Sequence, residues 1–327
     1  MINVEKLRLE FPILSRQVNG KPLVYLDNGA SSQKPKVVID AISNSYSNEY
    51  SNVHRGLHYL SNLATDNYER VRSIIQKFLS AEHEDEIVFT SGTTEGINLA
   101  AYAWAMQHLS KDDEIILSVM EHHANIVPWH FLRERLGVRL KWVDCDSNGN
   151  LDPQRIIDQF TEKTKLLAIT HMSNVLGTVV DVKTLCHEAR TKGIVSLVDG
   201  SQAAVHMPVN VSDIGCDFYA ITGHKLCGPS GSGALYVRNE IQKTMRPFLG
   251  GGDMIKDVFK DKVIYNDPPM KFEAGTPGIV QTIGLGVALE YMMNIGMDNI
   301  KAYEKDLTAY ARQRLEGLNW LNIQGKP

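Results

Sequence analysis

Two residues that directly follow apolar runs carry the strongest chemical signal in the sequence. Asp199 ends the run IVSLVD, and Lys225 comes shortly after the run FYAI. Ligands of open α/β sheets bind outside the carboxyl ends of strands, so both side chains are expected to face one crevice. A lysine removed from water persists when its amine is neutral or used, for example in an imine to an aldehyde cofactor. Taken singly, Asp199 is more commonly a capping residue and Lys225 a solvated surface charge.

The segment TSGTTEGIN follows the apolar run EIVFT and begins a helical pattern at Thr94. Backbone N–H groups and hydroxyls at a helix N-terminus bind phosphate, and the helix dipole favours an anion there. The alternative is a plain N-cap at Thr94, with Gly92 easing the turn. No Walker lysine follows, and GPSGSG lacks the GxGxxG order, so a nucleotide-binding loop is not indicated.

The segment MEHHANIVPWH contains two adjacent histidines ahead of Asn125. The HExxH order is absent and no carboxylate spacing completes a zinc triad, so no metal site is predicted. The functional interpretation is a histidine that stacks on an aromatic ring. The structural alternative is a histidine whose hydrogen bonds are satisfied at a helix start.

Short apolar runs alternate with longer helical patterns along most of the chain. This alternation predicts an α/β fold with a mostly parallel sheet covered by helices. The Gly-rich stretch GHKLCGPSGSG is expected to form an exposed loop between the last two strands. Strands are expected at 23–26, 86–90, 114–118, 139–143, 166–170, 194–199, 218–221 and 233–237. Helices are expected at 36–50, 61–80, 94–107, 125–136, 153–159 and 182–191.

The chain divides into three predicted parts. Residues 1–20 form an N-terminal segment, residues 21–278 the large domain, and residues 279–327 the start of a small C-terminal domain. The last part offers a helix that runs until Gly317, one possible strand and a turn. A helix with one strand cannot close a sheet or cover its own apolar face. We therefore expect the small domain to be incomplete and the sequence to be part of a longer protein.

The composition excludes several classes of protein. Lysine and arginine total 34 against 38 acidic residues, without long single-sign runs, so nucleic-acid binding is not indicated. The start of the chain lacks the apolar core of a signal peptide, and no later run approaches membrane-spanning length. A cytoplasmic protein without membrane contact is predicted. Neither a disulfide framework nor a zinc site is suggested, because no CxxC pair occurs among the four cysteines, Cys145, Cys186, Cys216 and Cys227.

Six segments in order resemble the successive signatures of the class V, fold-type I pyridoxal-phosphate enzymes. They are SGTTEGIN, MEHHANIVPW, THMSNVLGT, VDGSQAAVH, TGHKLCGPSGSG and FEAGTPG. The resemblance spans Leu23 to the end of the sequence, and MEHHANIVPW and VHRGLH narrow it to the group II cysteine desulfurases. It implies a fold-type I large domain, a homodimer, and pyridoxal 5'-phosphate as the cofactor.

Carried over position by position, the resemblance assigns a role to each motif residue. Lys225 would hold the cofactor covalently and act as a general base, and Asp199 would pair with the pyridine nitrogen. His122 would stack on the ring and take part in proton transfer. The other expected contacts are Asn174 and Gln202 near the phenolic oxygen, Thr93, Thr94, Thr222 and His224 at the phosphate, Thr276 at the other subunit's phosphate, and His54 and Arg55 at the substrate mouth.

The implied reaction removes sulfur from L-cysteine and gives L-alanine and an enzyme persulfide. The sulfur would pass to a SufE-like acceptor protein for iron–sulfur cluster assembly. In the family the persulfide cysteine lies in a C-terminal RTGHHCA-like loop, with arginines that bind the substrate carboxylate, and neither feature occurs here. Cys227 is interpreted as a packing residue, so this chain alone is not expected to turn over fully. Two alternatives are an aminotransferase or selenocysteine lyase of class V, and a non-catalytic fragment that binds cofactor or a partner.

Overall fold

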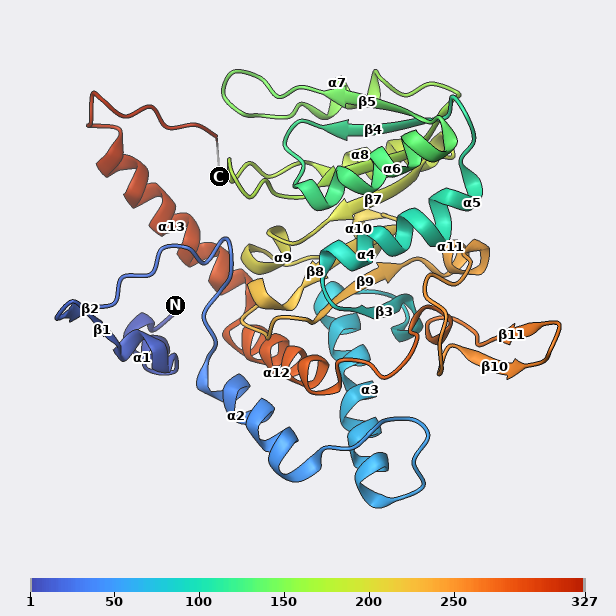
Figure 1. Ribbon diagram of the computed structural model, residues 1–327. Coiled ribbons are helices and arrows are strands. Elements are labelled where there is room, and N and C mark those ends of the chain that lie inside the picture. Colours follow the sequence, from blue (N-terminus) through green and yellow to red (C-terminus); the bar gives the residue numbers. More distant parts are fainter. Residues whose placement is uncertain (1, 326–327) are drawn as a thin grey trace.

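The computed structural model describes residues 2–325 and centres on a seven-stranded sheet (Figure 1). The strand order is β3-β9-β8-β7-β6-β4-β5. Strand β9 runs antiparallel to its neighbours β3 and β8, and the other neighbouring pairs are parallel. The predicted α/β fold with a mostly parallel sheet is therefore confirmed. The strands are β3 (Ile87–Thr90), β4 (Glu114–Ser118), β5 (Arg139–Val143), β6 (Thr164–Thr170), β7 (Val195–Asp199), β8 (Phe218–Thr222) and β9 (Gly233–Val237).

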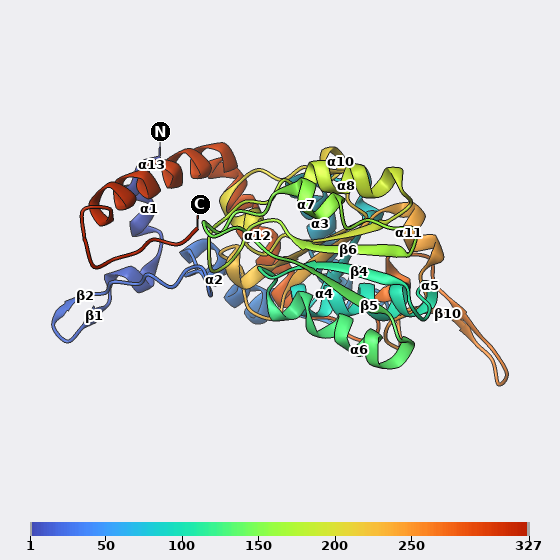
Figure 2. The same ribbon diagram turned by 90° about the horizontal axis from the view of Figure 1, so that it is seen from above.

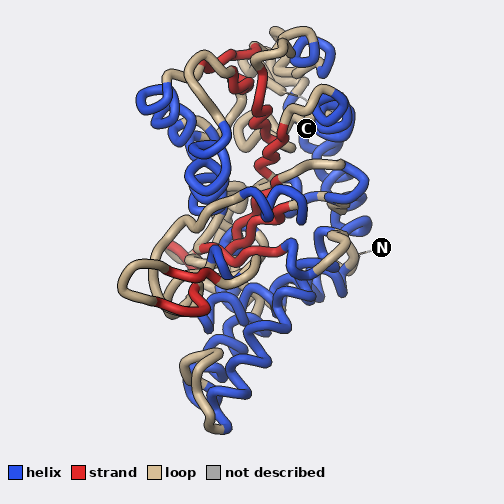
Figure 3. The backbone as a smooth tube through the Cα atoms, turned by 90° about the vertical axis from the view of Figure 1, so that its right-hand side faces the viewer, coloured by secondary structure: helices blue, strands red, loops and turns tan. Residues whose placement is uncertain are grey.

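Helices cover both faces of the sheet. Because successive residues of a strand point to opposite sides, each central strand contributes to two apolar cores. In β6, Leu167 and Ile169 belong to one apolar core, whereas Leu166 and Ala168 belong to the other. Figure 3 shows the strands running between the two helical layers. The first layer contains α3 (Tyr59–Leu79), α8 (Val182–Thr191), α10 (Val211–Ile214) and α12 (Ile279–Ile295), and the second contains α4 (Thr93–Leu99), α6 (Val127–Leu136) and α11 (Asn239–Thr244).

The helical run after β3 is continuous: α4 passes into the π-helical turn η4 (Ala100–Ala105) and then α5 (Met106–His108). Helix α2 (Lys36–Asn44) likewise ends in the π-helical turn η2 (Ser45–Glu49). Further short helices are α1 (Val4–Leu9), η1 (Pro12–Ser15), η3 (Glu84–Glu86), α7 (Pro153–Ile157), α9 (Ala203–His206) and η7 (Met270–Phe272). No helix of the described residues is long and apolar enough to cross a membrane.

The expected strand at 23–26 is wrong. Residues 23–26 pair with no strand, and the side chains of Val24 and Leu26 are exposed. The small hairpin of β1 (Gln17–Val18) and β2 (Lys21–Pro22) precedes them instead. An apolar run becomes a strand only where a neighbouring strand is within reach, because cross-strand contacts supply most of its stability.

The hairpin of β10 (Ile255–Val258) and β11 (Val263–Tyr265) and helix α13 (Met297–Leu315) extend from the body of the molecule, as does the N-terminal segment with α1, β1 and β2 (Figure 1, Figure 2). The hairpin lies in the Pro- and Gly-rich region, where the sequence predicted no element. Helix α13 contains no buried residue, whereas α12 packs against α2 and α3. The domain boundary at residue 279 stays a prediction.

Candidate active site

A cavity of about 440 Å³ lies at the carboxyl ends of the parallel strands. These strand ends are on the left of the sheet in Figure 1. Ligands of open α/β sheets bind at this edge. All the cofactor residues expected from the sequence line this cavity, apart from Thr276. They are Lys225, Asp199, Gln202, Asn174, His122, Thr93, Thr94, Thr222 and His224.

Asp199 is the last residue of β7 and is buried at the cavity. Its Oδ1 accepts hydrogen bonds from the backbone N–H of Ser201 at 2.9 Å and from the Ser201 hydroxyl at 2.6 Å. The Ser201 hydroxyl also lies 2.8 Å from Oγ1 of Thr93. A carboxylate only accepts, so Ser201 donates to Asp199 and receives the hydrogen of Thr93. Ser201 therefore joins two predicted site residues, a role that the sequence analysis did not assign to it.

Gly200 allows the backbone after Asp199 to approach a buried aromatic ring. A Cβ at this position would collide with the ring of Tyr219, which is fully buried. The Tyr219 hydroxyl is in turn 2.8 Å from Nδ1 of His171. Burial lowers the pKa of His171 to about 4, so this ring is neutral near pH 7. Tyr219 and His171 thus form a rigid wall behind Asp199.

Lys225 follows β8 through one 3-10 turn, η6 (Gly223–Lys225). The carbonyl of His224 accepts hydrogen bonds from the Ser32 backbone and hydroxyl and from Nζ of Lys34, each at 3.0 Å. The segment after residue 30 therefore clamps the lysine loop. Burial lowers the pKa of Lys225, and the nearby Asp199 charge opposes this shift. A depressed pKa gives more of the uncharged amine that covalent chemistry needs.

Hydroxyl groups and the start of the helical run from Thr93 form another part of the cavity. Gly92 has a φ of 149°, which L side chains rarely adopt, and a Cβ there would lie 3.1 Å from Oγ1 of Thr222. Glycine thus lets the loop after β3 approach the end of β8. Thr93 and Thr222 are buried, whereas Thr94 is exposed. These hydroxyls and the helix N-terminus suit a phosphate.

His122 caps the 3-10 turn η5 (His123–Asn125), with Nδ1 accepting the N–H of Ala124 at 3.1 Å. Burial lowers the pKa of His122, so the ring is mainly neutral near pH 7 and its proton then lies on Nε2. Among the described residues, no group of three or more His, Cys, Asp or Glu side chains is arranged to hold a metal ion. The His122 ring lines the cavity, where it can contact a ligand.

A buried carboxyl lies behind His122. Oε1 of Glu121 accepts the Ser118 hydroxyl at 2.6 Å, and Oε2 accepts Nδ2 of Asn125 at 2.7 Å. The Trp129 indole, which can only donate, bonds Oδ1 of Asn125 at 3.1 Å and so fixes the orientation of that amide. Burial raises the pKa of Glu121 to about 8. This network fixes the turn that carries His122, and no pattern in the sequence indicated it.

Gln202 and Asn174 contribute to the cavity wall in different ways. Gln202 is buried and donates Nε2 to the carbonyl of Gly29 at 2.8 Å, which holds the incoming chain against the sheet edge. Asn174 is exposed, on the loop that follows β6. Both side chains line the cavity. The carbonyl of Gly29, which accepts the hydrogen bond of Gln202, was not predicted from the sequence.

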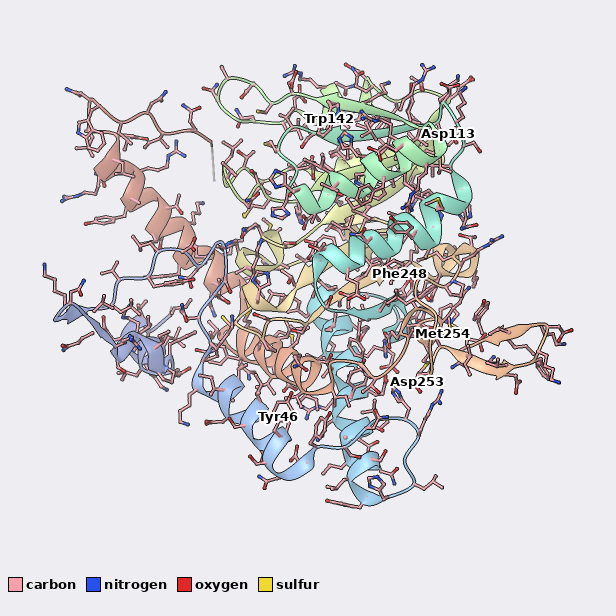
Figure 4. All side chains as sticks on the ribbon, viewed as in Figure 1. Tyr46, Asp113, Trp142, Phe248, Asp253 and Met254 are labelled. Carbon is pink, nitrogen blue, oxygen red and sulfur yellow. The ribbon has the colours of Figure 1, made fainter. Side chains whose placement is uncertain are left out.

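Three predicted residues lie outside this cavity. His54 and Arg55 line a second cavity of about 390 Å³, together with Asp253, which lies between α3 and the β10–β11 hairpin in Figure 4. Nε of Arg55 pairs with Oδ1 of Asp253 at 2.6 Å, and Nε2 of His54 lies 2.9 Å from Oε1 of Glu69. Thr276 is exposed and lines a third cavity of about 190 Å³. Within one chain, these residues are not brought to Lys225.

None of the four cysteines, all within the described range, lines the cavity. Cys227 is nearest to Lys225 in sequence, but its backbone is left-handed, with a φ of 58°, and its N–H donates to Ser32 Oγ at 2.9 Å. Burial raises the pKa of its thiol, and likewise that of Cys186 and Cys216. Thiols with raised pKa values are poor nucleophiles. The interpretation of Cys227 as a packing residue agrees with these contacts.

Known proteins resemble this chain over almost its whole length. Residues 24–327 match the family model Aminotransferase class-V, a pyridoxal-phosphate-dependent family. A probable cysteine desulfurase of Xylella fastidiosa (strain Temecula1) is 48% identical over 321 residues, which cover 98% of this chain and 77% of that protein. A cysteine desulfurase of Escherichia coli (strain K12 / DH10B) is 47% identical over 329 residues, covering 99% and 80%.

Solved structures give the same result. The apo structure of a cysteine desulfurase from Thermococcus onnurineus NA1 matches with a TM-score of 0.93 at 37% identity, covering 100% of this chain and 79% of that one. The cysteine desulfurase CsdA from Escherichia coli matches with a TM-score of 0.88 at 37% identity, covering 97% and 78%. The predicted fold type is thus confirmed. The chain belongs to the class V aminotransferase family and, within it, to the cysteine desulfurases.

Proposed function

We propose that this protein binds pyridoxal 5'-phosphate in the 440 Å³ cavity through Lys225 and removes sulfur from L-cysteine, giving L-alanine. The observation that carries the proposal is the placement of Lys225 and Asp199 on one cavity with a set of hydroxyls. A depressed lysine pKa, a buried carboxylate and a phosphate-type loop are the three features that this cofactor requires. They come from three different strand ends and meet here.

The residues present fit the cofactor. When bound, it supplies an aldehyde that bonds a primary amine and a ring that withdraws electrons from the amino-acid α-carbon. Nζ of Lys225 would hold it and, after displacement by the substrate amine, accept the α-proton. Asp199, held through Oδ1 by Ser201, would accept a hydrogen bond from the ring nitrogen. His122 would cover the ring face, and Thr93 and Thr222 would bind the phosphate.

The sulfur must leave on a thiol that this cavity does not supply. The accepting thiol gives up its proton and forms an S–S bond to the cysteine sulfur while the C–S bond breaks. The electron pair of the C–S bond stays with the β-carbon, which takes up a proton, and alanine remains. Since no cysteine of the described chain lines the cavity, we propose that the accepting thiol is brought from elsewhere. A SufE-like acceptor protein, with delivery to iron–sulfur cluster assembly, is the proposed later path of the sulfur.

We propose a homodimer as the working form. His54, Arg55 and Thr276 lie outside the cavity of their own chain. In a dimer Thr276 would reach the phosphate bound by the other subunit, and His54 and Arg55 would line its substrate mouth. This arrangement gives all three residues a function that they do not have within one chain.

The cofactor proposal is tested by trapping. Protein incubated with pyridoxal 5'-phosphate and then reduced with borohydride should carry the cofactor's mass on the peptide that contains Lys225. Lys225→Ala should take up no label, whereas Lys34→Ala, which changes a neighbouring lysine of the same loop contact, should still be labelled. Labelling of a different lysine in the wild type would refute the proposed role of Lys225.

The reaction is tested separately. Cofactor-loaded protein is given L-cysteine and an added dithiol as sulfur acceptor, and L-alanine is measured. Alanine formation that depends on the dithiol supports the proposal, because the chain places no thiol in the cavity. Absence of alanine from a loaded protein would refute the desulfurase activity of this chain while leaving cofactor binding intact.

A further inference from the structure

The guanidinium of Arg72, on α3, is buried and uses all five of its N–H groups. Nε donates to Oε2 of Glu69 at 2.9 Å, and Nη2 donates to the Glu69 and Glu273 carboxylates at 3.3 and 3.1 Å. Nη1 donates to the carbonyl of Ile87 at 2.6 Å and to Oε1 of Glu273 at 2.9 Å. Only 5% of the side chain is exposed. A planar group with no spare donor holds its partners in one geometry.

Arg72 and Glu273 together close the free edge of β3. This strand is the last in the sheet, so the backbone groups on its outer side have no strand to bond. The carbonyl of Ile87 accepts from Arg72, and the N–H of Phe89 donates to Oε1 of Glu273 at 2.8 Å. In an antiparallel pair, the backbone N–H and C=O groups of every second residue point to the partner strand. Those of Val88 and Thr90 point to β9, whereas those of Ile87 and Phe89 point outward. The ion pair thus replaces a missing neighbour strand.

Arg72 and its two carboxylate partners connect three segments that carry predicted site residues: the loop with Thr93, the segment with Thr276 and the loop with His54. Strand β3 runs directly into the loop with Gly92 and Thr93. Glu273 lies three positions before Thr276, and Glu69 bonds the ring of His54 at 2.9 Å. The guanidinium of Arg72 is also 4.2 Å from the centre of the Phe89 ring. A shift of this one group would therefore move the phosphate loop relative to the Thr276 segment.

We propose that Arg72 is a positioning residue for phosphate binding: through Glu273 it fixes the end of β3, and with it the loop that holds the phosphate. Arg72 touches neither the cavity nor the expected cofactor contacts. It acts through the strand edge and the 273–276 segment. The inference rests on the proposed function, because it requires a cofactor that carries a phosphate.

The test compares two ligands that differ only in the phosphate. Dissociation constants for pyridoxal 5'-phosphate and for pyridoxal are measured by absorbance titration of the wild type and of Arg72→Lys. Lysine keeps the charge but loses the planar five-donor fork. We expect the constant for pyridoxal 5'-phosphate to rise about tenfold or more, while that for pyridoxal changes by less than about twofold. Arg70→Lys, on the same helix but with an exposed ion pair, should leave both constants unchanged.

The outcomes separate positioning from general instability. An equal loss of affinity for both ligands in Arg72→Lys would overturn the inference, because a merely structural role does not distinguish them. If that variant does not fold, Glu273→Gln makes the same comparison, since glutamine removes the charge partner while keeping an acceptor for the Phe89 N–H. It should show the same selective loss, and a Glu273→Gln protein with wild-type constants would also overturn the inference. A wild type that binds neither ligand would refute the proposed function itself.

Discussion

The two sets of predicted site residues differ in how the fold positions them. In the cavity set, Asp199 ends β7 and Lys225 lies one 3-10 turn after β8, so the hydrogen-bonded sheet fixes their spacing. The outer set of His54, Arg55 and Thr276 lies on loops outside that cavity. Side-chain pairs hold His54 and Arg55 in place. The cavity set is therefore brought together within one chain. The outer set has no such frame, which is why we assign it to a second subunit.

The largest expected effect comes from a substitution next to Asp199, in the cavity set. In Gly200→Ala the new Cβ meets the ring of Tyr219, which is fully buried and bonded to His171. Overpacking of this kind costs about 1–3 kcal/mol, and relief of the clash would displace Asp199. We expect a midpoint of thermal unfolding lower by several degrees and weaker uptake of pyridoxal 5'-phosphate.

The matched control for this prediction is Gly250→Ala, where a Cβ would meet nothing within 4 Å. Thermal unfolding and cofactor titration are measured for both variants. Equal behaviour of the two would show that the backbone after Asp199 can yield, and the comparison between a rigid and an adaptable region would then fail.

Residues at strand ends could be predicted because the signal is local. Asp199 and Lys225 each follow a buried apolar run, and parallel strands end at the same edge. Ser201 stands in the same motif as Asp199, yet its contact with Thr93 joins positions 108 apart in sequence. Only the folded sheet brings these two hydroxyls together. The sequence therefore indicates which side chains reach the edge, but not which of them bond to one another.

The second prediction concerns pH and sharpens the cavity side. Burial raises the pKa of Glu121 to about 8 from a usual value of 4.5. A group whose pKa is raised by folding contributes stability that is fully present below the unfolded value and is lost as pH rises through the folded one. The free energy of unfolding of the wild type should thus fall, relative to Glu121→Gln, between about pH 4.5 and 8.

The difference should grow by about 2 kcal/mol between pH 5 and 6.5, because each pH unit inside this window corresponds to about 1.4 kcal/mol. Denaturant unfolding at pH 5, 6.5, 8 and 9 measures it. Glu162→Gln, a change at an exposed carboxyl, should show no such trend. A pH-independent difference for Glu121→Gln would mean that this carboxyl is ionised throughout and that the network behind His122 is not a buried neutral one.

The outer region could not be predicted because its partners are distant in sequence. Arg72 is a charged residue of a helix and would be taken for a surface charge, yet its partner Glu273 stands 201 positions away. The β10–β11 hairpin was likewise missed, because its strands are exposed and lack an alternating apolar pattern. The burial of this charge and the pairing of the hairpin strands depend on tertiary contacts. Neither produces a periodic pattern in the sequence.

The smallest expected effect tests the outer side. The hydrogen bond that the protonated His54 ring donates to Glu69 is the main cause that raises the pKa of His54 above 6.5. The stability from this pair is therefore fully present below pH 6.5 and is lost as pH rises through the raised value. His54→Asn removes the ring while tolerating the left-handed backbone, whose φ is 68°. Because both side chains are about a quarter exposed, the loss should be below about 1 kcal/mol at pH 5.5 and smaller at pH 8.5.

Denaturant unfolding at the two pH values measures this loss, with Lys36→Gln as control. That change breaks the exposed pair of Lys36 with Asp40, and its cost should be the same at both pH values. Without denaturant, the affinity of the His54→Asn protein for pyridoxal should equal that of the wild type, because His54 lies outside the cavity of its own chain. If pyridoxal affinity falls at protein concentrations where the chain is monomeric, His54 affects ligand binding in the cavity of its own chain. The separation into two regions would then be wrong, because a residue of the outer set would act on the cofactor within one chain.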